Sequence, residues 1–240
     1  MLAHRVIPTV LLRGQQLVKG KQFQSWRSVG HAAQAARIYA ARGCDEIILL
    51  DIAATPEGRG PDLDMVRVWT ENNFSPITVG GGVRSADDVR ALLAAGADKV
   101  AIGTCVGIID ECARRFGSQA VVLSIDCYYV PAFRDWDVGG YRAVDWAKIC
   151  AEQGAGEILL TSIDREGTME GYDLDLIRKV SAAVDIPVIA HGGCGTPQHM
   201  LEAIQAGASA VAVGAMFQFT DVTPKDCARY LVAHDVAARV

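Results

Sequence analysis

The chain has 240 residues, of which 50% are hydrophobic and 21% are charged, with 24 glycines and 8 prolines. This composition is typical of one compact domain, and a barrel of alternating strands and helices has roughly this length. The formal net charge is −5, from 23 basic and 28 acidic residues, without a long run of like charges. Binding to nucleic acid or to a membrane surface is therefore not expected.

Cysteine usage and the N-terminal sequence both indicate a protein that stays in the cytoplasm. The seven cysteines are an odd number, are scattered along the chain and never form a C-x-x-C pair. This is typical of reduced thiols rather than of disulfides or a zinc site. The apolar run before Arg13 is too short and too interrupted for a signal peptide or a membrane span. We therefore expect a cytoplasmic protein with no bound metal or cofactor.

Eight short runs rich in Val, Ile and Leu are predicted to be strands, and each precedes a segment with helical spacing. The runs are Val6–Leu11, Glu46–Asp51, Pro76–Gly80, Lys99–Gly103, Ala120–Asp126, Glu157–Ser162, Pro187–His191 and Ala210–Gly214. Continuous apolar runs are typical of parallel strands that are covered on both faces. Ser85–Ala95 and Thr196–Ala206 begin with a helix-capping residue and end before a glycine. The alternation predicts a single (β/α)8 TIM barrel over residues 1–240, with an open doubly wound sheet as the alternative.

The sequence also repeats itself. At an offset of 111 residues, Gly43–Val106 matches Gly154–Phe217 without a gap, as the glycine pairs 81–82 and 192–193 illustrate. A repeat of this length favours the closed barrel. It predicts a twofold internal repeat, with half-barrels at approximately 1–118 and 119–240.

Small residues end four of the predicted strands. The two strand ends in the first half match the two in the second half in the internal repeat. The first half has Gly81-Gly82 and Gly103-Thr104, and the second has Gly192-Gly193 and Gly214-Ala215. Glycine lets backbone N–H groups approach an anion, and the following helix N-terminus favours negative charge. The alternative is that these glycines only turn the chain. Because phosphate sites of this fold commonly follow strands 7 and 8, the second-half site is favoured. Two sites would suit a long substrate with a phosphate at each end.

Segments along nearly the whole chain resemble the cyclase subunit of imidazole glycerol phosphate synthase. They are MLAHRVIP at the start, LVKG at Leu17–Gly20, LLDIAAT at Leu49–Thr55, VGGGVRS at Val79–Ser85, GADKV at Gly96–Val100, GAGEILLTSIDREGT at Gly154–Thr168 and GYDLDL at Gly171–Leu176. The resemblance implies a doubled (β/α)8 barrel that accepts ammonia from a glutaminase partner. It also implies that this barrel, acting as a lyase in histidine biosynthesis, closes an imidazole ring on a bis-phosphorylated ribulosyl substrate.

In that family two carboxylates face each other across the barrel mouth, at the ends of strands 1 and 5. Asp126 supplies the strand 5 carboxylate here, but Leu11 stands where the family has the strand 1 aspartate. Leucine can neither accept nor donate a proton. Loss of a positioned general acid or base removes about 10²–10⁴-fold in rate. We therefore expect imidazole formation to be impaired.

The resemblance implies further ligand contacts at the mouth, by Lys19, Asp51, Gly103, Thr161 and Glu166. Two of these positions depart from the family, because Gly103 replaces an asparagine and Glu166 replaces an aspartate. The loop Cys127–Tyr141 after strand 5 is also shorter than in the family. Lys19 could equally be a solvated surface charge. His191, which ends strand 7, either reaches a phosphate or fills space.

Charged residues open four of the predicted strands, at the end of the barrel opposite the mouth. They are Arg5, Glu46, Lys99 and Glu157. Because an unpaired buried charge is costly, the two cations and two anions are expected to neutralise one another. One interpretation is a structural salt-bridge plug. The resemblance implies another, an ammonia gate, with Asp98 beside it contacting the glutaminase.

Three functions remain open at this point. The first is an ammonia-conducting, phosphate-binding subunit whose ammonia serves a separate amidotransferase acting on bacterial surface sugars, as in some relatives of the cyclase. Leu11, Gly103 and the stretch Arg165–Gly171 look more like that branch. The second is a working cyclase that tolerates Leu11. The third is an isomerase of the same doubled-barrel superfamily, which is less favoured because it also uses a strand 1 aspartate and needs no charged gate.

Overall fold

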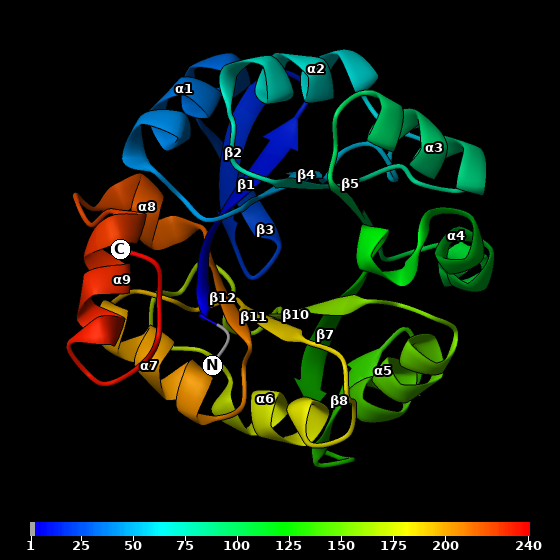
Figure 1. Ribbon diagram of the computed structural model, residues 1–240. Coiled ribbons are helices and arrows are strands. Elements are labelled where there is room, and N and C mark those ends of the chain that lie inside the picture. Colours follow the sequence, from blue (N-terminus) through cyan, green and yellow to red (C-terminus); the bar gives the residue numbers. More distant parts are fainter. Residues whose placement is uncertain (1–2) are drawn as a thin grey trace.

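Eight parallel strands close into a barrel, and helices surround it (Figure 1). The computed structural model describes residues 3–240. Around the barrel the strands follow chain order and are β1 (Arg5–Arg13), β4 (Ile47–Asp51), β5 (Ile77–Gly80), β6 (Lys99–Ile102), β7 (Val121–Val130), β10 (Glu157–Ser162), β11 (Val188–His191) and β12 (Ala210–Val213). Because β12 pairs in parallel with β1, the sheet closes on itself. The predicted (β/α)8 barrel is confirmed, and the open sheet is excluded.

The helices lie outside the barrel, and helices follow the capping residues Ser85 and Thr196 as predicted. They are α1 (Ala32–Arg42), α2 (Leu63–Asn72), α3 (Ala86–Ala94), α4 (Ile109–Phe116), α5 (Ala143–Glu152), α6 (Leu174–Ser181), α7 (Pro197–Gln205), α8 (Ala215–Phe219) and α9 (Pro224–Val232). Ser85 caps α3 by accepting from the backbone N–H of Asp88, and Thr196 caps α7 in the same way. Within residues 3–240, no helix has the length and apolar character needed to cross a membrane.

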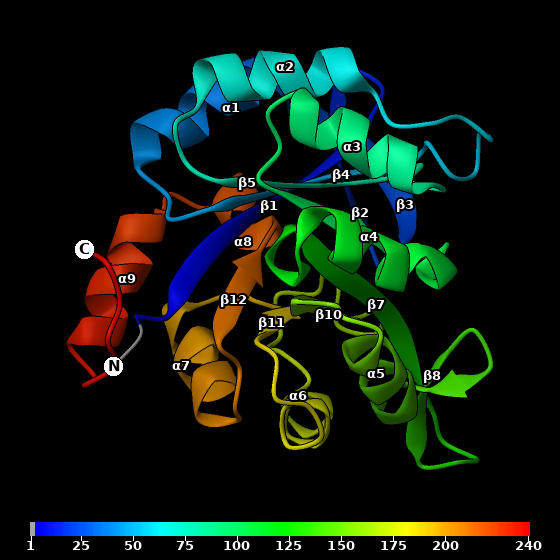
Figure 2. The same cartoon turned by 45° about the vertical axis from the view of Figure 1, so that its right-hand side comes forward.

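Two hairpins extend the barrel beyond the predicted strands. β1 continues past Leu11 and pairs with β2 (Gln16–Lys21), which in turn pairs with β3 (Gln24–His31). β7 continues to Val130 and pairs with β8 (Asp135–Val138), followed by β9 (Tyr141–Arg142). The segment that we expected to be a loop after strand 5 is therefore largely a hairpin. Figure 2 shows both hairpins at the end of the barrel opposite the chain termini, which is the mouth.

The core has two parts, which the barrel wall separates. A large cluster lies between the strands and the helices, and it includes Trp69, Leu92 and Leu123. A smaller cluster fills the barrel interior and consists of Ile7, Ile48, Ala101, Val122, Leu159, Ile189, Ala210 and Ala212. Alternate residues of each strand therefore face the two clusters, which explains the continuous apolar runs.

Candidate functional site

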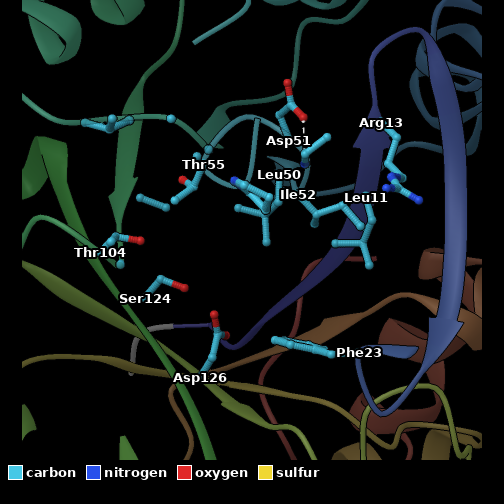
Figure 3. A pocket seen from close by; sticks show the side chains of 18 of the residues that line it. Leu11, Arg13, Phe23, Leu50, Asp51, Ile52, Thr55, Thr104, Ser124 and Asp126 are labelled. Atoms are coloured by element: carbon cyan, nitrogen blue, oxygen red, sulfur yellow. Dashed lines mark hydrogen bonds between the residues drawn. The ribbon is translucent and has the colours of Figure 1, made fainter. Parts of the chain in front are cut away.

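The carboxyl ends of the strands enclose a cavity of about 420 Å³ at the mouth (Figure 3). Its walls come from strand ends on both sides of the barrel and from the β2–β3 hairpin, which contributes Phe23 and Trp26. Active sites of (β/α)8 barrels lie at this face. The cavity is therefore the candidate functional site.

Asp126 lies on β7 and points into this cavity (Figure 3). It stands next to Thr161 in the register between β7 and β10. Although solvent reaches the carboxylate through the cavity, the surrounding barrel desolvates it and raises its pKa, which Thr161 lowers in part. A carboxyl group with a raised pKa in a cavity is suited to proton transfer.

Leu11 lies across the cavity from Asp126 (Figure 3). It is on β1, directly beside Leu50 of β4 in the strand register. Only 3% of Leu11 is exposed, so its isobutyl group is packed into the wall rather than turned away. Where the resemblance to the cyclase implies an aspartate, this cavity therefore has a hydrocarbon surface.

Asp51 ends β4 at the rim of the cavity, and Arg59 holds it. The guanidinium contacts both carboxylate oxygens, with Nη1–Oδ2 and Nη2–Oδ1 distances of 2.6 and 2.9 Å. The backbone N–H of Ala53 also donates to Asp51 at 3.1 Å. Arg59 could not be identified from the sequence, because nothing local shows that the loop between β4 and α2 folds back onto the end of β4. Asp51 therefore lines the cavity with its charge already neutralised by Arg59.

The phosphate-site residues of the first half line the cavity. Gly81, Gly82, Gly103 and Thr104 all belong to its wall. Gly81 has a φ of +112°, and a side chain there would collide with the Asp51 backbone carbonyl. Both observations explain why this position needs glycine. Phosphate binding by these lining residues stays a prediction.

The phosphate-site residues of the second half are buried and do not line the cavity. Gly192, Gly193, Gly214 and Ala215 all lie beneath other chain segments. A side chain at Gly214 would collide with the ammonium group of Lys19, which the β2–β3 hairpin brings there. The interior position of this site is a tertiary feature that the glycine pattern could not predict. Phosphate binding there stays a prediction.

Lys19 is buried, with 1% of its surface exposed, so the solvated-surface interpretation is wrong. Its Nζ has no hydrogen-bond partner among the described residues. Burial lowers the pKa of Lys19 to about 8, although the nearby Glu166 carboxylate favours the charged form. Burial likewise raises the pKa of Glu166, and its Oε2 has no partner within the described residues either.

His191 is also buried at the base of the cavity. Its Nδ1 lies 3.1 Å from the Thr161 hydroxyl. Burial, reinforced by the charge of Lys19, lowers the pKa of His191 to about 3. The imidazole is therefore neutral near pH 7, and it can offer a phosphate a hydrogen bond but no positive charge.

The four charged residues at the floor form a closed network of ion pairs. Lys99 Nζ lies 3.1 Å from Glu46 and 2.9 Å from Glu157. Arg5 pairs with both glutamates, at 2.6 Å from Glu46. The expected mutual neutralisation is thus present, while the role as a gate stays a prediction. Asp98 is exposed beside this network, and its carboxylate accepts from the backbone N–H of Ile77 at 2.8 Å.

Comparison of the sequence with known protein families shows which family the chain belongs to. The model of a family described as histidine biosynthesis protein matches residues 5–223. The chain belongs to the histidine biosynthesis protein family. The match covers all eight barrel strands, so the family and the closed barrel support each other. Among the described residues of this family member, no cluster of His, Cys, Asp and Glu side chains is arranged to hold a metal ion.

Proposed function

We propose that this barrel of the histidine biosynthesis family binds a phosphorylated ligand at its mouth and receives ammonia at its floor from a glutaminase partner. The ammonia then serves a separate amidotransferase that amidinates bacterial surface sugars, rather than efficient imidazole formation. The observation that carries the proposal is Leu11, which faces Asp126 across the cavity. Ring closure needs protons removed and delivered on opposite faces of the substrate, and only one of the two walls has a group for this at the family's positions.

The floor network supports the ammonia route. Four charged side chains pair with one another at the end of the barrel opposite the mouth. A partner that competes for one of these ions would open the network. Above it, the interior is filled by the apolar cluster that includes Ile7, Ile48 and Leu159. Such an interior opposes ammonium far more strongly than neutral ammonia, because burying a charge costs much more than burying a neutral polar group. Passage requires the larger side chains of this cluster to shift.

A functional cyclase of histidine biosynthesis is the second candidate, and one observation favours it. The raised pKa of Asp126 suits a group that serves both as acid and as base. In that case a bound water would take the place of the missing strand 1 carboxylate.

One assay separates the two candidates. Purified protein is given free ammonia and the bis-phosphorylated ribulosyl substrate, and imidazole product is measured. We expect negligible turnover by the unmodified chain and an increase of about 10²-fold for Leu11→Asp, because the substitution restores a second carboxylate. Leu11→Asn, similar in size but unable to ionise, is the matched control and should stay inactive. Ordinary enzymatic turnover by the unmodified chain would refute the proposal.

The partner is tested at the floor. A glutaminase subunit of imidazole glycerol phosphate synthase is titrated against the barrel by calorimetry. Asp98→Lys should weaken the complex by about tenfold, because a charge at the interface is reversed. Asp98→Asn keeps an oxygen to accept from the Ile77 N–H and should weaken the complex less. Equal affinity for all three chains would place the partner elsewhere.

A further inference from the structure

The mouth cavity has two chemically different walls. On one side, Leu11 and Leu50 lie side by side on β1 and β4, and Ile52 follows at the end of β4 (Figure 3). On the other side, Asp126 and Thr161 are neighbours in the register of β7 and β10. A ligand in the cavity therefore meets an apolar patch at Leu11, Leu50 and Ile52, although Arg13 and Asp51 from the same two strands also line the cavity.

The β2–β3 hairpin adds an aromatic pair to this cavity. Phe23 and Trp26 both line it, with ring centroids 6.2 Å apart and ring planes tilted by 39°. Gly20 lies under the Trp26 ring, where any side chain would collide with that ring. The hairpin thus places two aromatic surfaces where a ligand enters.

The turn that places Phe23 is held in an unfavourable backbone conformation. Gln22 and Phe23 connect the two strands with φ angles of +53° and +59°. Positive φ at both central residues is a feature of type I′ turns, which favour Asn and Gly. The turn persists because Gln22 is anchored on both sides, its backbone N–H donating to Glu166 O at 2.9 Å and its side chain to Asp164 O at 2.8 Å. Such strain is often found at ligand-binding sites.

Few uncompensated charges remain inside the cavity. The carboxylates of Asp51 and Glu57 are both paired with Arg59. His191 is neutral near pH 7. Two charged residues that line the cavity, Asp126 and Arg13, form no ion pair within the described part of the chain. Unpaired charge in the cavity is therefore confined to Asp126 and Arg13, and neither belongs to the apolar patch of Leu11, Leu50 and Ile52.

We propose that the phosphorylated ligand of this cavity carries an apolar ring, an aryl group, which packs against Leu11 and Leu50 beneath Phe23. This inference rests on the proposed function, from which it takes a phosphorylated ligand at the mouth, and it adds that the phosphate lies at the first-half glycines Gly81, Gly82 and Gly103, which line the cavity. Gly103 provides the space, because a methyl group added there would meet no atom closer than 3.5 Å. A sugar ring against Leu11 would leave its hydroxyls without partners, whereas an aryl ring would bury apolar area.

The test is a comparison of three phosphates by isothermal titration calorimetry near pH 7.5, with the full chain. The probes are 1-naphthyl phosphate, ribose 5-phosphate and inorganic phosphate. We expect 1-naphthyl phosphate to bind at one site per chain, with a Kd at least tenfold below those of the other two. The sign of the heat-capacity change is a second readout, since burial of an apolar ring makes it negative.

Substitutions then locate the ring. Leu11→Asn should abolish the tenfold preference, whereas Leu11→Met should keep it, because methionine preserves an apolar surface of similar volume. Ile38→Asn is the matched control for non-specific adsorption, since Ile38 is an exposed apolar residue on α1 outside the cavity. Ile38→Asn should leave the affinity for each of the three phosphates unchanged. Circular dichroism establishes that each variant is folded.

The outcomes distinguish the two proposals. If all three phosphates bind with similar affinity, or if Leu11→Asn keeps the preference, the aryl ligand is refuted while phosphate binding stands. If none of the three binds, phosphate binding at the mouth, and with it the proposed function, is refuted as well.

Discussion

Lys19 shows how one residue links the hairpin to the chemistry of the site. Its ammonium group is buried near Glu166 and His191, and it has no hydrogen-bond partner among the described residues. Burial of a charge without a partner is unfavourable, so this position reduces the stability of the ligand-free protein. A ligand contact by Lys19 stays a prediction.

The pH dependence of stability tests this burial. The pKa of Lys19 is lowered to about 8 from 10.5, so between these pH values the unfolded chain binds more protons than the folded one. Lys19 should therefore contribute a rise of about 3 kcal/mol to the free energy of unfolding across this window, in opposition to the fall contributed by buried thiols whose pKa is raised, such as Cys150. Lys19→Met should lack this rise. Urea unfolding at several pH values between 7 and 10.5 measures both chains, and parallel curves would mean that Lys19 is solvated.

The β2–β3 hairpin is the element that distinguishes the mouth from a plain barrel. It carries Lys19 to the end of β12 and Phe23 to the cavity. Its tip is held against the loop between β10 and α6, where Gly167 packs on the backbone of Gly20. The hairpin is therefore fixed by a backbone contact rather than by side-chain packing alone.

This contact predicts a difference between two glycines of similar conformation. Gly167 and Gly58 have φ angles of +71° and +70°, but a side chain at Gly167 would collide with the Gly20 carbonyl, whereas at Gly58 nothing lies within 4 Å. Gly58→Ala should cost about 1 kcal/mol for the positive φ. Gly167→Ala should cost about 1–3 kcal/mol more, because of the collision. Thermal or urea unfolding measures both. Equal losses would show that the hairpin does not rest on this loop.

At the scale of the whole molecule, the floor network joins strands that are distant along the chain. Glu46 from the start of β4 and Glu157 from β10 share the cations Arg5 and Lys99. The Thr78 hydroxyl also donates to Glu46 at 2.8 Å. The network closes the floor from several sides, whether or not it also acts as a gate.

A double-mutant cycle tests whether the network acts as a unit. Glu157→Gln should destabilise the protein by about 3 kcal/mol, because both cations lose one of their partners. Lys99→Met removes one of these cations. The double variant should therefore lose at least about 1 kcal/mol less than the sum of the single losses. Urea unfolding provides all three values, and strict additivity would show that the pairs are independent.

The sequence by itself determined the eight barrel strands of this protein, but not the two hairpins at the mouth. Strand positions followed from continuous apolar runs, and helix starts followed from capping residues such as Ser85 and Thr196, because both signals are local. The charged residues at the starts of four strands predicted the floor network, because all parallel strands of a barrel start at the same end. Leu11 was also identified from the sequence, by its position in a motif. The internal repeat stays a prediction, although Gly96 and Gly207 share nearly the same φ, +109° and +112°.

Only the tertiary structure decided how these elements enclose a site. Closure of the barrel depends on the pairing of β12 with β1, which joins the two ends of the chain. The burial of Lys19 and the pairing of Arg59 with Asp51 depend on segments that fold back over strand ends. The same folding opens the first-half glycines to the cavity and buries those of the second half. Such contacts depend on chain geometry over long distances, and no residue pattern within one segment encodes them.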